Sequence, residues 1–191
     1  MIRKYYKNIL FFLILILFLA TLSFFLYFLG PEEIVNNLGI RNSYLLAFVV
    51  SFFGGFSTWS SISFIATLIT LSAGGINPIY LGFVAGIALA IGDLVILYIG
   101  SKGRELVVGK WEKKLNKFSK KIKTNWVGKI APLITYLYMG FTPLPNDFIL
   151  VFLAFIEYPK KKLYLPIILG DLTFTLLVSI LASKGFSFFV S

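Results

Sequence analysis

The sequence contains no cysteine and no histidine. Without cysteine the chain forms no disulfide and offers no thiolate nucleophile or thiol-bound metal, and without histidine it lacks the commonest proton shuttle and metal ligand. Charged residues are scarce, at 14% of 191 residues, whereas hydrophobic residues make up 58%. Soluble domains contain roughly a quarter charged residues and about 45–50% apolar residues. The composition therefore excludes an ordinary soluble domain, indicates one integral membrane domain, and points to no cofactor.

Acidic residues are few, with 8 Asp and Glu against 18 Lys and Arg, and the basic residues are clustered. Ten of the 18 lie between Lys102 and Lys129, three precede residue 8, and three form Lys160–Lys162. Basic clusters beside apolar spans face the cytoplasm and its anionic lipids. The predicted partners are therefore membrane lipids with anionic head groups, and nucleic acid is not expected.

The first apolar run extends from Ile9 to Leu29. It is longer than the core of a signal peptide, has no small-residue cleavage site, and is long enough to cross the bilayer. We predict that residues 1–43 form a retained transmembrane helix and an external connector. Residues 44–191 then form the main membrane domain.

Two segments of the main domain, 44–73 and 130–158, are broken by turn-forming residues, whereas 79–100 and 163–183 are continuous spans. If both broken segments are re-entrant hairpins and the N-terminus is cytoplasmic, 16 of the 18 Lys and Arg residues lie inside; if every segment crosses, 12 lie outside. The positive-inside rule favours the hairpins. The residues expected at the breaks are Gly54, Gly55, Ser57, Thr58, Pro143, Pro145 and Asn146.

The predicted fold is thus an all-α, multi-pass protein of the cell membrane, built from transmembrane helices and two re-entrant helical hairpins. A hairpin followed by a span occurs twice, in opposite orientations, which makes an inverted repeat. Secondary transporters with such repeats bind substrate where broken helices meet near the middle of the membrane.

Three aspartates, Asp93, Asp147 and Asp171, lie in apolar segments that contain no Lys or Arg at similar depth. A carboxylate at the membrane centre costs at least ~2.5–3.5 kcal/mol and is seldom present without a function. If the repeats face each other, Asp93 and Asp171 occupy related positions and can approach one another, which would suit proton coupling. We predict that the three aspartates are transport or proton-coupling residues.

Structural roles are the alternatives for these residues. Asp93 lies about two helical turns from Lys102 and Arg104 and could form an ion pair with either. Asn146 or Asp147 could cap the half-helix that follows the second break.

The basic segment 101–129 carries apolar residues at helical spacing, with lysines between them. This pattern predicts an amphipathic helix on the cytoplasmic lipid surface. The residues expected to contact lipid there are Trp111, Lys113, Lys114, Lys117, Lys120, Lys121 and Trp126.

The block from Gly86 to Gly103 contains the pattern G-x5-G-D-x4-Y-x-G and resembles the DedA, or SNARE-associated Golgi protein (VTT domain), superfamily. The stretch Phe141–Asp147, followed by an apolar helix, a basic turn and a last span, is similar to the second half of that family. The resemblance covers residues 44–185. It implies two facing re-entrant hairpins and an activity that moves lipids across the bilayer, including polyprenyl-phosphate carriers, proton-linked transport and phospholipid scrambling. By position, Asp93, Pro143, Pro145 and Asp147 fall in the family's functional blocks.

Two features depart from that family pattern. Many relatives carry an acidic motif in the first hairpin and arginines in the second, whereas the first break here, 54–61, has no acid and the second hairpin has no arginine. The loss of those cations weakens the expectation of phosphate binding, since helix N-termini replace a cation only in part.

We therefore expect a DedA-like transporter or scramblase for lipids or lipid-phosphate head groups, with proton linkage as an option, and not an enzyme. One alternative is an intramembrane aspartyl protease that uses Asp93 and Asp171, although the first glycine of the G-x-G-D motif is absent. The other is a non-catalytic scaffold that docks a partner through the basic helix.

Overall fold

The computed structural model describes residues 31–54, 58–107, 116, 119–120 and 126–190. These residues form helices joined by short turns, with no strand in the part described, as the all-α prediction requires. The elements in chain order are α2 (Pro31–Leu38), α3 (Ile40–Gly54), α4 (Thr58–Ala73), α5 (Pro78–Val107), α7 (Trp126–Phe141), α8 (Asp147–Phe155), the 3₁₀ helix η2 (Lys160–Lys162) and α9 (Tyr164–Val190).

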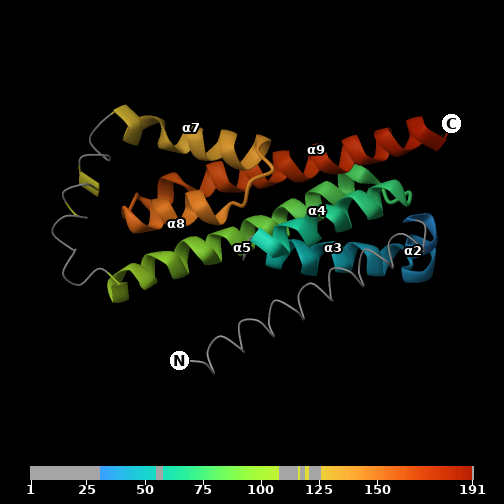
Figure 1. The fold of residues 1–191 in the computed structure, drawn as a ribbon, viewed down its shortest axis with the longest axis horizontal. Coiled ribbons are helices and arrows are strands. Elements are labelled where there is room, and N and C mark those ends of the chain that lie inside the picture. Colours follow the sequence, from blue (N-terminus) through green and yellow to red (C-terminus); the bar gives the residue numbers. More distant parts are fainter. Residues whose placement is uncertain (1–30, 55–57, 108–115, 117–118, 121–125, 191) are drawn as a thin grey trace, which may run out of the picture.

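The two longest helices, α5 and α9, lie side by side and antiparallel, and form the most extensive helix contact in the described part of the molecule (Figure 1). The shorter helices pack around this pair in a regular way. α3 packs on α5 and α4 on α9, whereas α7 packs on α9 and α8 on α5. In each of the pairs α3/α4 and α7/α8, the first helix therefore packs on the long helix that follows the pair in the chain. The second helix packs on the other long helix.

Glycines allow α5 and α9 to approach closely. A Cβ atom on Gly86 would lie 2.9 Å from the Cα of Leu172, and one on Gly82 would lie 2.9 Å from the Cα of Leu176. Gly82 and Gly86 are four residues apart, the small-residue spacing that lets membrane helices pack backbone to backbone. The Thr175 hydroxyl also donates a hydrogen bond across this contact to the Gly82 carbonyl, at 2.8 Å.

The turn before α5 fixes where that helix begins. Gly75 has φ +91°, a conformation that favours glycine. Asn77 then accepts hydrogen bonds from the backbone N–H groups of Ile79 and Tyr80 at 3.0 and 3.2 Å, and Pro78 occupies the first helical position. This is a capped helix start with proline at its preferred position.

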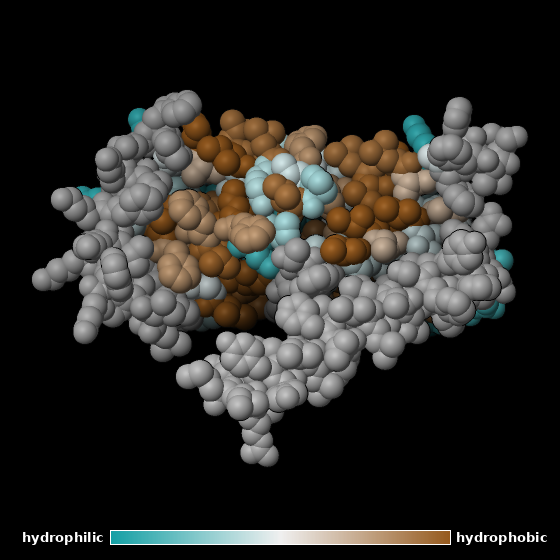
Figure 2. All heavy atoms as spheres, in the orientation of Figure 1, coloured by the Kyte–Doolittle hydropathy of each residue, from teal (hydrophilic) through white to brown (hydrophobic). Residues whose placement is uncertain are grey.

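Two helices in the described residues are long and apolar enough to cross a membrane, Pro78–Ser101 and Lys160–Gly185. Large apolar side chains are exposed along α3, α5, α7 and α9, including Leu45, Ile87, Leu137 and Leu165. Figure 2 shows this apolar surface along the middle of the molecule, interrupted near its centre by paler and hydrophilic residues. Soluble monomers rarely expose so large an apolar surface, which is consistent with a lipid environment.

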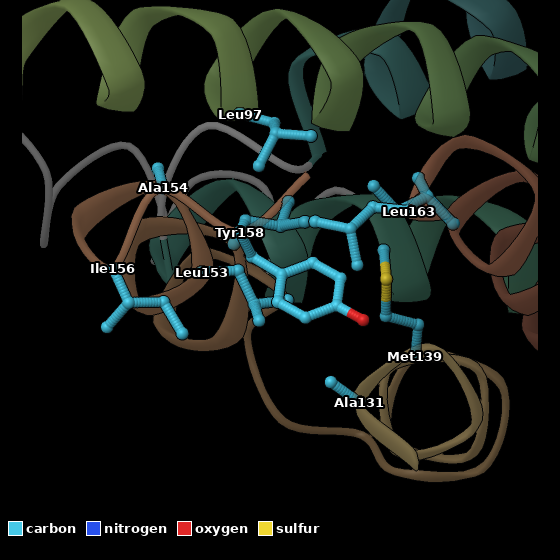
Figure 3. Packing of buried hydrophobic residues seen from close by; sticks show 10 residues of the cluster. Leu97, Ala131, Met139, Leu153, Ala154, Ile156, Tyr158 and Leu163 are labelled. Carbon is cyan, nitrogen blue, oxygen red and sulfur yellow. The ribbon is translucent and has the colours of Figure 1, made fainter. Parts of the chain in front are cut away.

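The interior contains two apolar clusters. One joins α5, α7, α8 and α9 and includes Leu97, Met139 and Leu153, with the Tyr158 ring among them (Figure 3). The Tyr158 hydroxyl donates to the Gly128 carbonyl at 2.7 Å, so this buried polar atom is satisfied. The second cluster joins α2, α3, α4 and α5 around Leu68.

The predicted segments compare closely with these helices. The spans expected at 79–100 and 163–183 correspond to α5 and α9, and both helices extend further. The breaks predicted in 44–73 and 130–158 lie between α3 and α4 and between α7 and α8. The apolar span within α5 ends at Ser101, close to the expected residue 100, while the helix itself continues to Val107 into the basic segment. The N-terminal span lies outside the described residues.

Candidate functional site

The candidate site lies where the break between α7 and α8 reaches the α5/α9 pair. Asn146 immediately precedes α8, and its amide nitrogen donates hydrogen bonds to Asp93 Oδ2 at 2.6 Å and to Asp171 Oδ1 at 3.1 Å. One amide group therefore joins the second break to the middle of both long helices. Only the NH2 end of an asparagine can face two carboxyl groups in this way, so its carbonyl oxygen points elsewhere.

Asp93 and Asp171 are both 0% exposed. Asp93 Oδ1 and Asp171 Oδ2 are buried and receive no hydrogen bond from another residue in the described structure, and the two carboxyl groups interact with each other. Carboxyl groups taken out of water at this depth are expensive unless they are paired or hydrogen-bonded. The sequence-based expectation that these two residues approach each other agrees with the geometry, and Asn146 is the group that lies between them.

Asp147 lies beside this pair. It occupies the first turn of α8, is half-buried, and interacts electrostatically with Asp93. Its Oδ1 is buried without a hydrogen-bond partner in the described structure. The three predicted aspartates are thus gathered in one region, with Asp147 nearer the surface than Asp93 and Asp171.

The capping role suggested for Asn146 was wrong. Asn146 is at the N-cap position of α8 but makes no side-chain capping bond, and its φ of −64° and ψ of −25° are helical. An N-cap side chain reaches the N–H groups of the first turn from an extended backbone conformation. The Asn146 amide instead points toward α5 and α9, where it bonds Asp93 and Asp171.

Local hydrogen bonds hold the second break in shape. The Tyr138 hydroxyl donates to the Pro145 carbonyl at 3.1 Å, and the Thr142 hydroxyl donates to the Tyr138 carbonyl at 2.6 Å. Pro143 and Pro145 end α7 because proline has no N–H with which to continue a helix. Tyr138 therefore links the end of α7 to the residue just before Asn146.

A small cavity of about 20 Å³ lies between the two breaks. Apolar walls come from α4, α5 and α9, and the residues from the breaks are Gly54, Ser61, Thr142, Pro143, Leu144 and Asn146. The Ser61 hydroxyl donates to the Gly54 carbonyl at 2.9 Å. The cavity brings together residues of both predicted breaks and is large enough for about one water-sized group.

The remaining predicted residues contribute less. Pro143 is exposed and Pro145 is half-buried. Lys120 is exposed, and the side chains of Lys102 and Arg104 lie outside the described set, so the ion pair suggested for Asp93 stays untested. The other predicted residues outside the described side chains are Gly55, Ser57, Thr58, Trp111, Lys113, Lys114, Lys117, Lys121 and Trp126.

Tyr138 and Thr142 were not singled out as individual site residues from the sequence. Thr142 and Tyr138 lie just before the P-x-P break, which is the only signal that marked them. Hydroxyl groups are common in apolar helices and usually bond their own backbone. Sequence alone therefore could not separate them from packing residues.

Comparisons with protein-family models, with curated proteins and with solved structures found no significant match to this chain. The family resemblance carried by the glycine–aspartate block and the P-x-P break is therefore supported only by those residues.

Proposed function

We propose that this chain is a multi-pass protein of the cell membrane, with a cytoplasmic N-terminus, that moves lipid head groups across the bilayer as a DedA-like transporter or scramblase. The observation that carries the proposal is the Asn146 bridge, which joins a helix break to two fully buried carboxyl groups on the two long apolar helices. Polar groups at such depth are typical of substrate and proton pathways.

The packing pattern supports the two hairpins as halves of an inverted repeat. α3 and α7 occupy equivalent places, each against the long helix that follows it, and α4 and α8 occupy the other pair of equivalent places. α3, α4, α7 and α8 have 15, 16, 16 and 9 residues. A crossing helix needs about 20 residues, so each of these helices suits half of a re-entrant hairpin.

Helix breaks inside a membrane must be buried in protein or line a cavity. The cavity between the two breaks meets this requirement and holds the polar groups of Ser61, Thr142 and Asn146. A head group moving past this point would meet polar side chains while its acyl chains stay against the apolar outer surface. This arrangement needs no cofactor.

The pair of buried carboxyl groups, Asp93 and Asp171, supports a linkage between lipid movement and proton binding. Two ionised carboxylates that share one amide in a low-dielectric interior repel each other, and the favoured state holds one proton between them. Loss or gain of that proton changes the charge that faces a passing head group. The lysines of the basic segment would hold the cytoplasmic side against anionic lipids, at about 1 kcal/mol for each lysine near the surface.

A hydrolytic role is less well supported. Paired-aspartate hydrolysis requires a water positioned between the two carboxyl groups, where one of them acts as general base. The Asn146 nitrogen lies within hydrogen-bond distance of both carboxyl groups and occupies that position.

The test is lipid movement in vesicles that contain the purified full-length chain. Trace lipids with a fluorophore on one acyl chain are bleached from outside by dithionite, and bleaching beyond the outer leaflet reports transbilayer movement. We expect the wild-type chain to raise the initial rate well above that of empty vesicles, and Asn146→Leu to lower it at least about tenfold, because it removes both hydrogen bonds, one of them to a charged carboxylate. Asn42→Leu is the matched control, because Asn42 is exposed and bonds only the Leu38 carbonyl in the described structure. Wild-type vesicles that bleach no faster than empty ones would refute the proposal.

A further inference from the structure

The turn that follows α8 is a place where separate parts of the chain meet at one end of the bundle. The Ser119 hydroxyl donates a hydrogen bond to the Ile156 carbonyl, and Ser119 is buried there. The Tyr158 hydroxyl donates to the Gly128 carbonyl, so the start of α7 is held against the same turn. Figure 1 shows the start of α7, the end of α8 and the start of α9 at this end, together with the end of α5. Lysines that are far apart in the sequence are therefore gathered in one region.

Four of these lysines form what we call the lysine patch. They are Lys129, in the first turn of α7, and the three residues of η2, Lys160–Lys162. All are exposed except Lys160, which is half-buried. None of the four forms an ion pair within the described residues. Glu157 is the one acidic side chain described in the turn, so the four lysines leave this end of the molecule positively charged.

One member of the lysine patch is held in place by an aromatic ring. The Lys160 ammonium lies over the Tyr98 ring, 5.0 Å from its centroid, and this contact links η2 to α5. A cation in this position is attracted by the negative face of the ring. A side chain that is already positioned loses less conformational freedom when it binds a ligand than a mobile one does. Lys160 is therefore better prepared to bind an anion than an isolated surface lysine.

The tyrosines of α5 indicate the depth of the patch in a membrane. Tyr80 and Tyr98 are 67% and 58% exposed. They are 18 residues apart, which corresponds to about 27 Å along a helix. Tyrosine is enriched at both membrane–water interfaces, and the hydrocarbon core between them is about 30 Å thick. The Tyr98 ring, and the Lys160 ammonium over it, therefore lie at the level of the lipid head groups.

We propose that the lysine patch beside Tyr98 binds the head group of an anionic lipid that carries two phosphates. Lysine binds phosphate as a point charge, and basic pockets between transmembrane helices hold head groups of this kind. Two phosphates fit better than one because the lysines come from two elements, with Lys129 on α7 and Lys160–Lys162 in η2. A head group with two phosphates can contact both elements at once.

The surroundings of the patch favour a lipid over a soluble anion. Ile99, next to Tyr98 on α5, is 56% exposed, and Leu165, in the first turn of α9, is 66% exposed. Acyl chains can lie against such apolar side chains while the phosphates face the lysines. The patch contains no residue of the Asn146 bridge or of the cavity, so a lipid bound here is a resident lipid. The inference holds whether or not the chain moves lipids.

The test is a lipid titration of the purified full-length chain in detergent, read by native mass spectrometry. The probes are cardiolipin, which has two phosphates, and phosphatidylglycerol with the same acyl chains, which has one. We expect cardiolipin to bind at least about tenfold more tightly, since its second phosphate binds without a second association cost. Inorganic pyrophosphate carries two phosphates without acyl chains and should bind at least about a hundredfold more weakly than cardiolipin. These comparisons use the wild-type chain and need no variant.

Two sets of variants locate the site. Lys160→Gln should weaken cardiolipin binding about fivefold, the effect of one lysine near anionic lipid. Lys184→Gln removes the same charge from an exposed position near the end of α9 and should change binding by less than about twofold. Tyr98→Leu keeps every charge but removes the ring, and should weaken binding about two- to fivefold, whereas Tyr98→Phe keeps the ring and should bind like wild type. Tyr80→Leu is the matched control at the other end of α5.

The possible outcomes are distinct. Equal affinities for cardiolipin and phosphatidylglycerol would overturn the inference, because one phosphate would then suffice. Pyrophosphate binding as tightly as cardiolipin would also overturn it, since the ligand would then be a soluble anion. Equal effects of Lys160→Gln and Lys184→Gln would mean that net charge alone attracts the lipid, and an unchanged affinity in Tyr98→Leu would place any site away from that ring. Either result contradicts the site proposed here, and neither bears on lipid movement.

Discussion

Replacing Asn146 by leucine removes the amide that joins the second break to the two long helices. Leucine keeps the branched shape of asparagine but cannot donate, so the change removes the two hydrogen bonds to Asp93 and Asp171. If the pair holds one proton, one bond goes to a charged acceptor and one to a neutral acceptor. The summed loss is then roughly 2–4.5 kcal/mol, from about 1.5–3 kcal/mol for the charged bond and about 0.5–1.5 kcal/mol for the neutral one.

Thermal unfolding of the purified protein in detergent measures this loss. For a chain of 150–250 residues, each kcal/mol lowers the unfolding midpoint by about 2–4 °C, so Asn146→Leu should lower it by about 4–18 °C. Asn42→Leu changes an exposed residue and should stay within about 0.5 kcal/mol of wild type. A midpoint for Asn146→Leu equal to that of Asn42→Leu would refute the bridge.

A double-mutant cycle shows whether the loss arises from the bridge itself. Asp171→Asn neutralises one acceptor, so Asn146→Leu should cost less in that background than in wild type. Residues in direct hydrogen-bond contact couple by about 0.5–3 kcal/mol, and we expect at least about 1 kcal/mol here. Simple additivity of the two changes would mean that Asn146 and Asp171 do not interact, whatever the effect of either change alone.

Three further changes test the fold around the site. Gly86→Ala should lower the unfolding midpoint because its Cβ would lie 2.9 Å from the Leu172 backbone, at a cost of about 1–3 kcal/mol, whereas Gly185→Ala has open space and should be neutral or stabilising by up to about 1 kcal/mol. Tyr138→Phe removes the bond to the Pro145 carbonyl and should cost about 1 kcal/mol by the same assay, with lipid movement slowed because the second break is less well held. Gly75→Ala forces alanine into φ +91° and should cost about 1–3 kcal/mol in thermal unfolding; an unchanged midpoint would contradict the assigned turn.

The helical segments and their breaks could be predicted from the sequence because they depend on local chemistry. Continuous apolar runs of span length predicted α5 and α9, and the P-x-P stretch predicted the end of α7 because proline cannot donate the helical hydrogen bond. Charge density placed the end of the apolar span near residue 100, but it could not show that the same helix continues to Val107.

The partners within the site could not be predicted in the same way. Asn146 bonds residues that are 53 and 25 positions away in the sequence. Those contacts depend on how closely α5 and α9 cross, which Gly82 and Gly86 decide through backbone contacts to Leu176 and Leu172. A glycine in an apolar run does not reveal which helix it will meet, so the sequence supplied the aspartates but not the amide between them.

The backbone conformation of Asn146 explains why this residue, and not a neighbour, forms the bridge. A residue at an N-cap usually adopts an extended conformation and satisfies an orphan N–H of its own helix, a contribution of about 1 kcal/mol. Asn146 gives up that bond, its amide points toward α5 and α9, and the carboxylate of Asp147 provides the favourable charge at the helix start instead. Serine has only one hydrogen to donate, and aspartate has none when ionised. A single short side chain that donates to both carboxyl groups needs an atom with two hydrogens. The amide nitrogen of asparagine is such an atom. A capping bond would stabilise α8 locally, whereas the bridge stabilises the contact with the two long helices. The side chain of Asn146 makes the bridge and not the cap.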